Sequence, residues 1–423
     1  MELVLAKGAN AHIQNTKKFK TVLIEYKFRS LYEPDEATAR TLLKNMMVTN
    51  TQKYPSQKMM DHQMSWLYGA SLSSNSQRYG NHHVVTLRLR VVNDKFIGGD
   101  ETLLEEAFSF LREIIFHPNV SDNAFHSETF HREKKNLKNY FDSIEENKSG
   151  YSLFRLNQLL FKGTNQVYLG IGDVQYLDAI TPESLYNTYL KMLQEDSIDI
   201  FVSGDVEEER IQQILEQSKF SNRESVTADI FVTSDLVNPV VKKEESSDVT
   251  QGNLLFGFSS PAYFSNKHYY AAMIFDGIFG GFPHSKLFQN VREKESLAYS
   301  ASSSIDNIRG KMIVRTGIDF SKRNQVEKIV MEQLKDMQLG NFSEELISQT
   351  KEMLINQYKQ NDDHQGKALS KIYTNELLAG YNISDEEWLR SLMDVTKENI
   401  IEVAKQMKLE AIFFLKGEEE NHA

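Results

Sequence analysis

The chain has 423 residues, of which 40% are hydrophobic and 25% charged, so its length predicts two or three domains and its composition argues against intrinsic disorder. Its formal net charge of −11 argues against nucleic acid as a partner, because an acidic surface repels phosphate. The absence of cysteine excludes disulfides, thiolate metal sites and cysteine nucleophiles.

The N-terminal residues carry no long apolar segment of the kind that signal peptides contain. No part of the chain approaches the roughly 18 consecutive apolar residues of a membrane-spanning helix. We therefore expect a cytoplasmic protein with no membrane partner, and the lack of cysteine is compatible with that compartment.

The first half of the chain alternates between β-prone apolar segments and segments with helical spacing. In chain order we expect a strand at residues 19–28, a helix at 35–48, two strands within 70–92, helices at 103–115 and 124–146, a helix at 180–193 and a strand at 198–203. The helix at 180–193 opens with Thr181, Pro182 and Glu183, a favourable N-cap and first turn.

The second half repeats this order of elements. We expect a strand at residues 252–260, a helix at 268–279, two strands within 299–316, helices at 325–338, 343–360 and 395–407, and a strand at 411–416. Each half ends with a strand followed by glycine and an acidic residue, at Gly204 and Gly417. A repeat of this length indicates a duplicated domain rather than a solenoid.

The predicted fold class is α+β, with two homologous domains that each consist of a mostly antiparallel sheet covered by helices on one face. We place an N-terminal domain at residues 1–206, a linker region at 207–250 and a C-terminal domain at 251–423. The charged stretch 242–251 is interpreted as a solvated loop in that linker.

Several common catalytic motifs are absent: the chain has no P-loop, no G-x-G-x-x-G and no G-x-S-x-G. No two histidines lie three or four residues apart, the spacing that places two metal ligands on one helix face. His126 and His131 are five apart with Glu128 between them, and we interpret them as surface residues. A zinc site assembled from histidines remote in sequence is left open at this point.

Residues 279–300, FGGFPHSKLFQNVREKESLAYS, resemble the C-terminal-half signature of the pitrilysin/insulinase metallopeptidases, the inverzincins. That signature has a glycine-rich turn, then Ser-[Lys/Arg]-Leu-Phe, Arg-Glu-Lys and Leu-Ala-Tyr-Ser. The order of elements in both halves is also similar, so the resemblance covers essentially the whole chain. In its size, lack of cysteine and degenerate motif the chain is similar to the bacterial member associated with elongation factor P aminopentanol modification.

Active members of this family carry H-x-x-E-H on the first helix, where two histidines bind zinc and the glutamate is the general base. The resemblance places these positions on Thr41, Lys44 and Asn45, and places the third ligand nearest Asn139. Because none of these residues can serve as imidazole ligand or carboxylate base, we expect no catalytic residues, no metal and no cofactor. The apolar stripe around them predicts an ordinary core helix.

The resemblance implies substrate-binding roles for Arg292 and Tyr299, whose guanidinium and phenol are suitable donors for a peptide carbonyl. The alternative is that Arg292 pairs with a nearby glutamate and Tyr299 packs in the sheet. Gly280 and Gly281 form either a flexible turn that faces substrate or a turn that requires positive φ, and we favour the turn geometry.

Two functional hypotheses follow. In the first, the chain is a non-catalytic subunit of a heterodimeric zinc peptidase, which pairs with an H-x-x-E-H homologue and contributes contacts to a peptide or unfolded-protein substrate in a closed chamber. In the second, it is a peptide- or protein-binding or assembly factor without a peptidase partner. A third, weaker hypothesis is an active peptidase with relocated zinc ligands.

Overall fold

The chain divides into two compact units, each of which takes a segment from the other half of the sequence. The computed structural model describes residues 1–98, 102–218, 220–264, 266–294 and 298–418. Unit 1 contains Met1–Asp142, Tyr168–Asp229 and Asp363–Ser370, and unit 2 contains Ser143–Val167, Ile230–Asp362 and Lys371–Ala423. The units therefore differ from the predicted boundaries at residues 206 and 251, because sequence position alone does not reveal an exchanged segment.

Unit 1 is built on a six-stranded sheet with the order β1-β2-β8-β3-β5-β4. Its strands are β1 (Glu2–Ala6), β2 (Ala9–Asn15), β3 (Thr21–Leu31), β4 (Ser71–Tyr79), β5 (His82–Val92) and β8 (Ser197–Gly204). All neighbouring strands are antiparallel except β2 and β8. Along β3, Glu25 and Lys27 alternate with Ile24, Tyr26 and Phe28, so the sheet has one apolar and one polar face.

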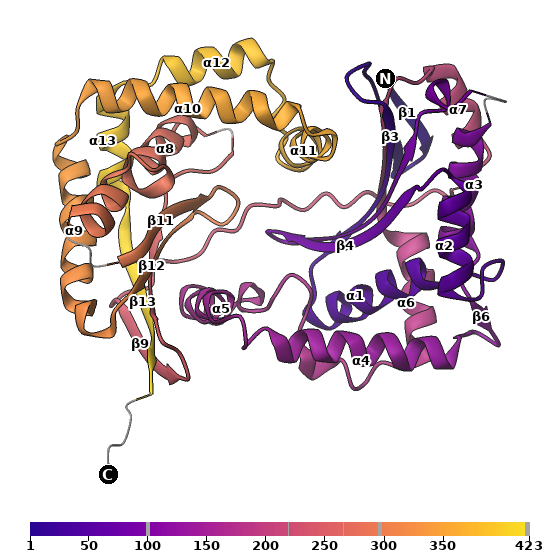
Figure 1. The fold of residues 1–423 in the computed structure, drawn as a ribbon, viewed down its shortest axis with the longest axis horizontal. Coiled ribbons are helices and arrows are strands. Elements are labelled where there is room, and N and C mark those ends of the chain that lie inside the picture. Colours follow the sequence, from indigo (N-terminus) through magenta and orange to yellow (C-terminus); the bar gives the residue numbers. More distant parts are fainter. Residues whose placement is uncertain (99–101, 219, 265, 295–297, 419–423) are drawn as a thin grey trace. The chain divides into compact units, whose positions relative to one another are not determined.

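The helices of unit 1 that pack against the sheet are α1, α3, α6 and α7 (Figure 1). The helices are α1 (Pro34–Thr49), α2 (Gln57–Trp66), α3 (Leu103–Phe116), α4 (Ser127–Ser143), α6 (Pro182–Glu195), α7 (Glu208–Glu216) and most of α11 (Gln365–Lys371), with a small hairpin of β6 (Val120–Ser121) and β7 (Ala124–Phe125). The N-cap predicted at Thr181 is confirmed, since its hydroxyl accepts from the Ser184 N–H in a capping box.

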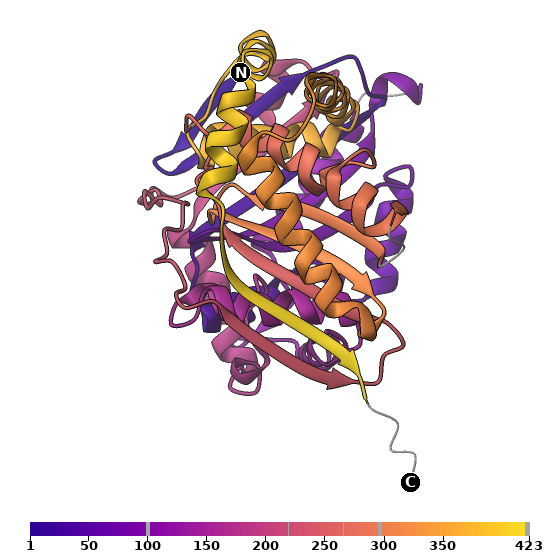
Figure 2. The ribbon, with the colours of Figure 1, turned by 90° about the vertical axis from the view of Figure 1, so that its left-hand side faces the viewer.

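Unit 2 contains a five-stranded sheet with the order β11-β12-β10-β13-β9. Its strands are β9 (Val241–Ser247), β10 (Gly252–Ser259), β11 (Ala298–Asp306), β12 (Lys311–Ile318) and β13 (Lys408–Gly417). The only parallel pair among them is β13 with β9, and the two arrows point the same way in Figure 2. This order repeats β4-β5-β3-β8-β2 of unit 1, so the predicted duplication and mostly antiparallel sheets are confirmed.

The interpretation of residues 242–251 as a solvated loop is wrong for most of that stretch. Residues 242–247 belong to β9, which pairs with β13 at the edge of the sheet. An edge strand with both faces largely exposed needs no apolar alternation, and lysine is common at such edges. By its place in the sheet order, β9 corresponds to β2, so the second copy of the repeat begins before residue 251.

Helices lie on both faces of the unit 2 sheet. The helices are α5 (Lys148–Leu160), α8 (Tyr269–Asp276), α9 (Arg323–Leu339), α10 (Glu344–Asp362), α12 (Asp385–Met393) and α13 (Lys397–Gln406). On one face, β-strand residues such as Phe256 and Phe414 join a core with α8, α9 and α13. The exchanged helix α5 covers the opposite face, where Leu156 and Leu160 pack with Leu255 and Phe413.

Short helical turns connect these elements. They are the 3-10 turns η1 (Asp94–Phe96), η2 (Asn165–Val167), η3 (Val174–Tyr176) and η6 (Phe320–Lys322), and the π-helical segments η4 (Gly277–Gly281), η5 (Phe288–Lys294) and η7 (Ile372–Leu378). Within the described ranges, no helix is both long and apolar enough to cross a membrane.

Candidate functional site

Helix α1, which carries the degenerate motif, is a buried helix against β4 and β5. It starts with Pro34 at its first position, where the missing N–H of proline costs no hydrogen bond. The prediction of an ordinary core helix is confirmed, because the residues of its apolar stripe are at most 1% exposed: Leu42, Leu43, Met46 and Met47.

Arg40 fixes α1 to the sheet through a buried ionic network. Its guanidinium donates to both carboxylate oxygens of Asp196, at 3.1 and 2.5 Å, and to the Phe28 carbonyl and His83 Nδ1, each at 3.0 Å. Burial raises the pKa of Asp196, and the Arg40 charge opposes this rise. Burial and the same charge hold the pKa of His83 well below its usual range. The network sets the position of the helix directly beside Thr41.

Three of the predicted degenerate positions meet on α1 and already have partners within the chain. Thr41 is buried, and its hydroxyl lies 2.8 Å from the Ser76 hydroxyl of β4. The Lys44 ammonium donates to Oδ1 of Asn45 at 2.6 Å. Burial lowers the pKa of Lys44, and the Glu133 carboxylate of α4 opposes that shift.

These side chains do not fit the zinc ion that the family resemblance implies. Zinc sites without cysteine use imidazole and carboxylate ligands, whereas this helix offers a hydroxyl, an ammonium and an amide. The Lys44 cation would in addition repel a dication. Among the residues that the structure describes, no group of three histidine, aspartate or glutamate side chains is arranged to hold a metal.

The structure does not bring Asn139 to this cluster. Asn139 is exposed on α4, and in the described part of the chain no hydrogen bond joins it to Thr41, Lys44 or Asn45. The α4 residue whose charge acts on Lys44 is Glu133, about 1.7 turns earlier in the helix. The role assigned to Asn139 therefore stays a prediction, and Glu133 is the carboxylate that sequence reasoning missed.

Gly280 and Gly281 end the π-helical segment η4, and neither has positive φ. The turn geometry that requires positive φ is therefore wrong. The need for glycine is steric, because a Cβ at Gly280 would lie 2.7 Å from the backbone nitrogen of Ser303 on β11. Ser303 also donates to the Asp276 carboxylate at 2.5 Å, and burial raises the pKa of Asp276 to about 6.

Arg292 and Tyr299 lie on either side of residues 295–297, which are outside the described residues. Arg292 is exposed on η5, with its guanidinium 4.7 Å from the centre of the Phe288 ring. Tyr299 is 71% exposed, so the alternative that it packs in the sheet is wrong. It is the extra residue of a β-bulge, because Ala298 and Ser300 pair with adjacent residues of β12. The bulge explains why an aromatic side chain in a strand points to solvent.

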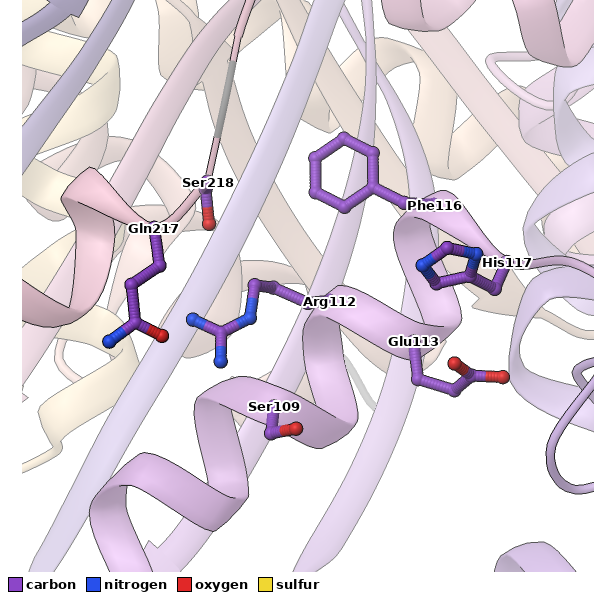
Figure 3. Close-up of a pocket in the computed structure, with 7 residues that line it drawn as sticks. All are labelled: Ser109, Arg112, Glu113, Phe116, His117, Gln217 and Ser218. Carbon is purple, nitrogen blue, oxygen red and sulfur yellow. The ribbon is translucent and has the colours of Figure 1, made fainter.

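A separate cavity of about 390 Å³ lies between α3 and the end of α7 in unit 1 (Figure 3). The Arg112 guanidinium points toward Gln217, and it donates to the Ile214 carbonyl at 3.3 Å. The Glu113 carboxylate, on the other side, accepts from the Lys53 N–H at 2.9 Å. None of the predicted site residues lines this cavity, and both charged groups have structural partners.

The interpretation of His126 and His131 as surface residues is confirmed, since both are exposed, His126 just before α4 and His131 on it. The hydrogen-bond partners of α1 could not be predicted from the sequence. Ser76, His83 and Asp196 lie far from residues 40–45 in sequence, and local pattern carries no signal for such pairings. Arg40 beside an apolar stripe indicates only that some partner is needed, because a buried charge requires one, and does not indicate which residue supplies it.

Comparison with known proteins places this fold and site in a family. Residues 179–354 match the family model described as Peptidase M16 inactive domain. The chain is 35% identical over 414 residues to the probable inactive metalloprotease YmfF of Bacillus subtilis, covering 97% of this chain and 96% of that protein. A crystal structure of a conserved protein from Enterococcus faecalis is 42% identical, with a TM-score of 0.94 and coverage of 100% and 99%.

A peptidase M16 inactive domain from Pseudomonas fluorescens shares the fold at 15% identity, with a TM-score of 0.79 and coverage of 99% and 98%. The chain belongs to the peptidase M16 family. The family resemblance drawn from residues 279–300 is thereby confirmed, and the chain is an M16 homologue without zinc-binding residues on its first helix.

Proposed function

We propose that this chain is the non-catalytic subunit of a heterodimeric zinc peptidase, whose partner is an M16 homologue that carries H-x-x-E-H. One observation carries the proposal. Helix α1 keeps its buried packing and its Arg40 network, although Thr41, Lys44 and Asn45 cannot bind zinc. Decay of an unused enzyme would not be expected to leave Arg292 and the exposed Tyr299 in the second half.

In the proposed pair, the partner supplies the zinc-bound water and the general base. This chain supplies hydrogen-bond donors, because the Tyr299 phenol and the Arg292 guanidinium are suited to a peptide carbonyl or a developing oxyanion. Two chains of two units each would close the substrate chamber. Edge strand β4, the outermost strand of its sheet and a neighbour of α1, offers backbone groups to an extended peptide.

The resemblance and the composition support two finer elements of the proposal. The similarity to the member associated with elongation factor P aminopentanol modification makes that pathway our proposed setting. A cytoplasmic location accords with it, because the chain contains no cysteine.

The test is reconstitution. The purified chain is mixed with an H-x-x-E-H homologue from the same source, and cleavage of a quenched peptide is followed. The proposal predicts no cleavage by this chain alone and a large gain over the partner alone. No gain, together with no complex by size-exclusion chromatography, would contradict it.

The second candidate function is peptide binding or assembly without hydrolysis, which the exposed edge strand β4 also permits. Peptide binding by the isolated chain, with no homologous partner in pull-downs, would favour it. Metal analysis of the purified chain addresses the relocated zinc site, since near-stoichiometric zinc would overturn both proposals.

A further inference from the structure

A basic groove lies on unit 1, where β5 meets the segment Asp363–Ser370 that the second half contributes. We define it by the side chains of Arg88, Arg90, His364 and Lys367, around a cavity of about 460 Å³. Arg88 and Arg90 are two residues apart on β5, so they project from the same face of the sheet. Elements far apart in sequence therefore place their cations together.

The groove has a fixed floor. Gln365 is 4% exposed, and its amide donates to the carbonyls of Ser203, at 2.7 Å, and Thr21, at 3.2 Å, while it accepts from the Thr21 hydroxyl at 3.2 Å. Helix α11 lies beside Arg88 at Gly366, where a Cβ would make an ordinary contact at 3.8 Å from the guanidinium. Buried hydrogen bonds of Gln365 thus hold the segment on the sheet.

The charges of the groove run against the balance of the whole chain, which is −11. Its lining has the cations Arg88, Arg90 and Lys367 but a single carboxylate, Asp363, which pairs with Lys18 at 2.5 Å. Arg88 contacts the buried Glu25, which also pairs with Lys27. A concave surface of one sign concentrates ligands of the opposite sign.

We propose that the basic groove binds acidic side chains of a peptide, so that the substrates held by this chain are rich in aspartate or glutamate close to the bound segment. The inference rests on the proposed function, because it names the substrate class of the same peptide-holding subunit. Arg88 and Arg90 can each present two N–H donors to a carboxylate, and Lys367 adds a point charge. An acidic peptide fits better than nucleic acid, because its carboxylates can be confined to one short segment in the groove, whereas a phosphate backbone carries its charge onto the surrounding acidic surface.

The experiment compares two fluorescent peptides that differ only in four glutamates replaced by glutamines, with the full-length chain. Fluorescence anisotropy should show roughly tenfold tighter binding of the glutamate peptide at low salt, and the preference should fade above a few hundred millimolar salt. The variant R90Q/K367Q should lose most of the preference, because both exposed cations are removed. The control R390Q/K405Q removes two exposed cations from unit 2 and should retain it.

Equal binding of the two peptides, or an unchanged preference in R90Q/K367Q, would overturn the inference, and so would absence of binding by either peptide. Tighter binding of a single-stranded oligonucleotide of equal charge would also overturn it. The proposed function is tested separately, by cleavage. If the two peptides bind equally but the reconstituted pair still cleaves the glutamine peptide, the pairing stands and only the acidic preference is lost.

Discussion

Arg40 and Thr41 are neighbours on α1, but Arg40 has a structural role and Thr41 occupies a position of the degenerate zinc motif. Arg40 is 3% exposed and contacts a carboxylate, an imidazole and a carbonyl that come from three different strands or connections. Thr41 stands where the family resemblance places a zinc ligand, yet it hydrogen-bonds Ser76 of the neighbouring strand. Arg40 therefore fixes the helix in place, whereas the neighbouring Thr41 offers no imidazole to a zinc ion.

We expect Arg40→Met to lower the free energy of unfolding of unit 1 by about 3 to 5 kcal/mol, because Asp196 would remain buried without its cation. Urea unfolding followed by circular dichroism measures the change. Arg390→Met, at an exposed position, is the matched control and should shift the midpoint little. A shift of the same small size for both variants would mean that the Arg40 network does not hold the helix.

We expect the stability of the chain to depend on pH because of His82. Burial, with help from Arg29, lowers its pKa from the usual 6.5 to about 4 in the folded chain. Between these values the unfolded state binds more protons, so the free energy of unfolding falls as the pH drops from about 6.5 to about 4, by roughly 3 kcal/mol. His82→Gln should reduce this slope, as measured by denaturation at several pH values. An identical slope in both proteins would refute the assignment.

We expect substitution of Tyr299 to lower activity without affecting folding. Because its side chain is 71% exposed, Tyr299→Phe should leave the melting temperature unchanged. With the zinc-bearing partner, loss of the phenol should lower kcat/KM on the order of 100-fold, the range for an oxyanion donor. Tyr68→Phe removes another exposed phenol, 63% exposed, and should leave the rate unchanged. Equal rates for the two variants would remove Tyr299 from the site.

At the scale of elements, the strands and helices with clear periodicity could be predicted from sequence, and those without it could not. The strand at 19–28 and the helix at 35–48 are predictable because their buried apolar residues recur at strand and helix spacing. Strand β9 was missed because it is an exposed edge with charged residues on both faces. Helix α5 packs in the other unit, which is a long-range event that no local pattern encodes.

The candidate site divides in the same way. Motif comparison could place Thr41, Lys44, Asn45, Arg292 and Tyr299, because a motif preserves spacing along one segment. It could not supply Glu133 or Ser76, since those contacts depend on how α4 and β4 meet α1. The reason for Gly280 was also out of reach, because it lies in the approach of η4 to a strand some twenty residues later.

The close approach of η4 to β11 gives a prediction at this scale. Gly280→Ala should destabilise unit 2 by about 1 to 3 kcal/mol, because the new Cβ would lie 2.6 to 2.7 Å from Ser303 and the backbone must shift. Gly366→Ala is the control, since a Cβ there meets only ordinary contacts in a helix and should be neutral or slightly stabilising. Thermal unfolding of the two variants measures the difference. Equal stability would show that η4 can accommodate a Cβ at residue 280 without a shift of the backbone.

At the scale of the whole molecule, the chain is a duplicated α+β unit in which each copy borrows a segment from the other half. The exchange means that neither half of the sequence contains one complete unit. The repeated sheet order indicates a duplication, and the residues to which we assign substrate contacts, Arg292 and Tyr299, lie in the second half. That asymmetry is what a dedicated partner subunit predicts.

The central claim is best tested by titrating a fixed amount of the H-x-x-E-H homologue with this chain while recording the rate of peptide cleavage. The account predicts a rise that saturates at one equivalent, with zinc bound to the homologue and none to this chain. A rate that is independent of the added chain, or zinc and activity in this chain alone, would contradict the account.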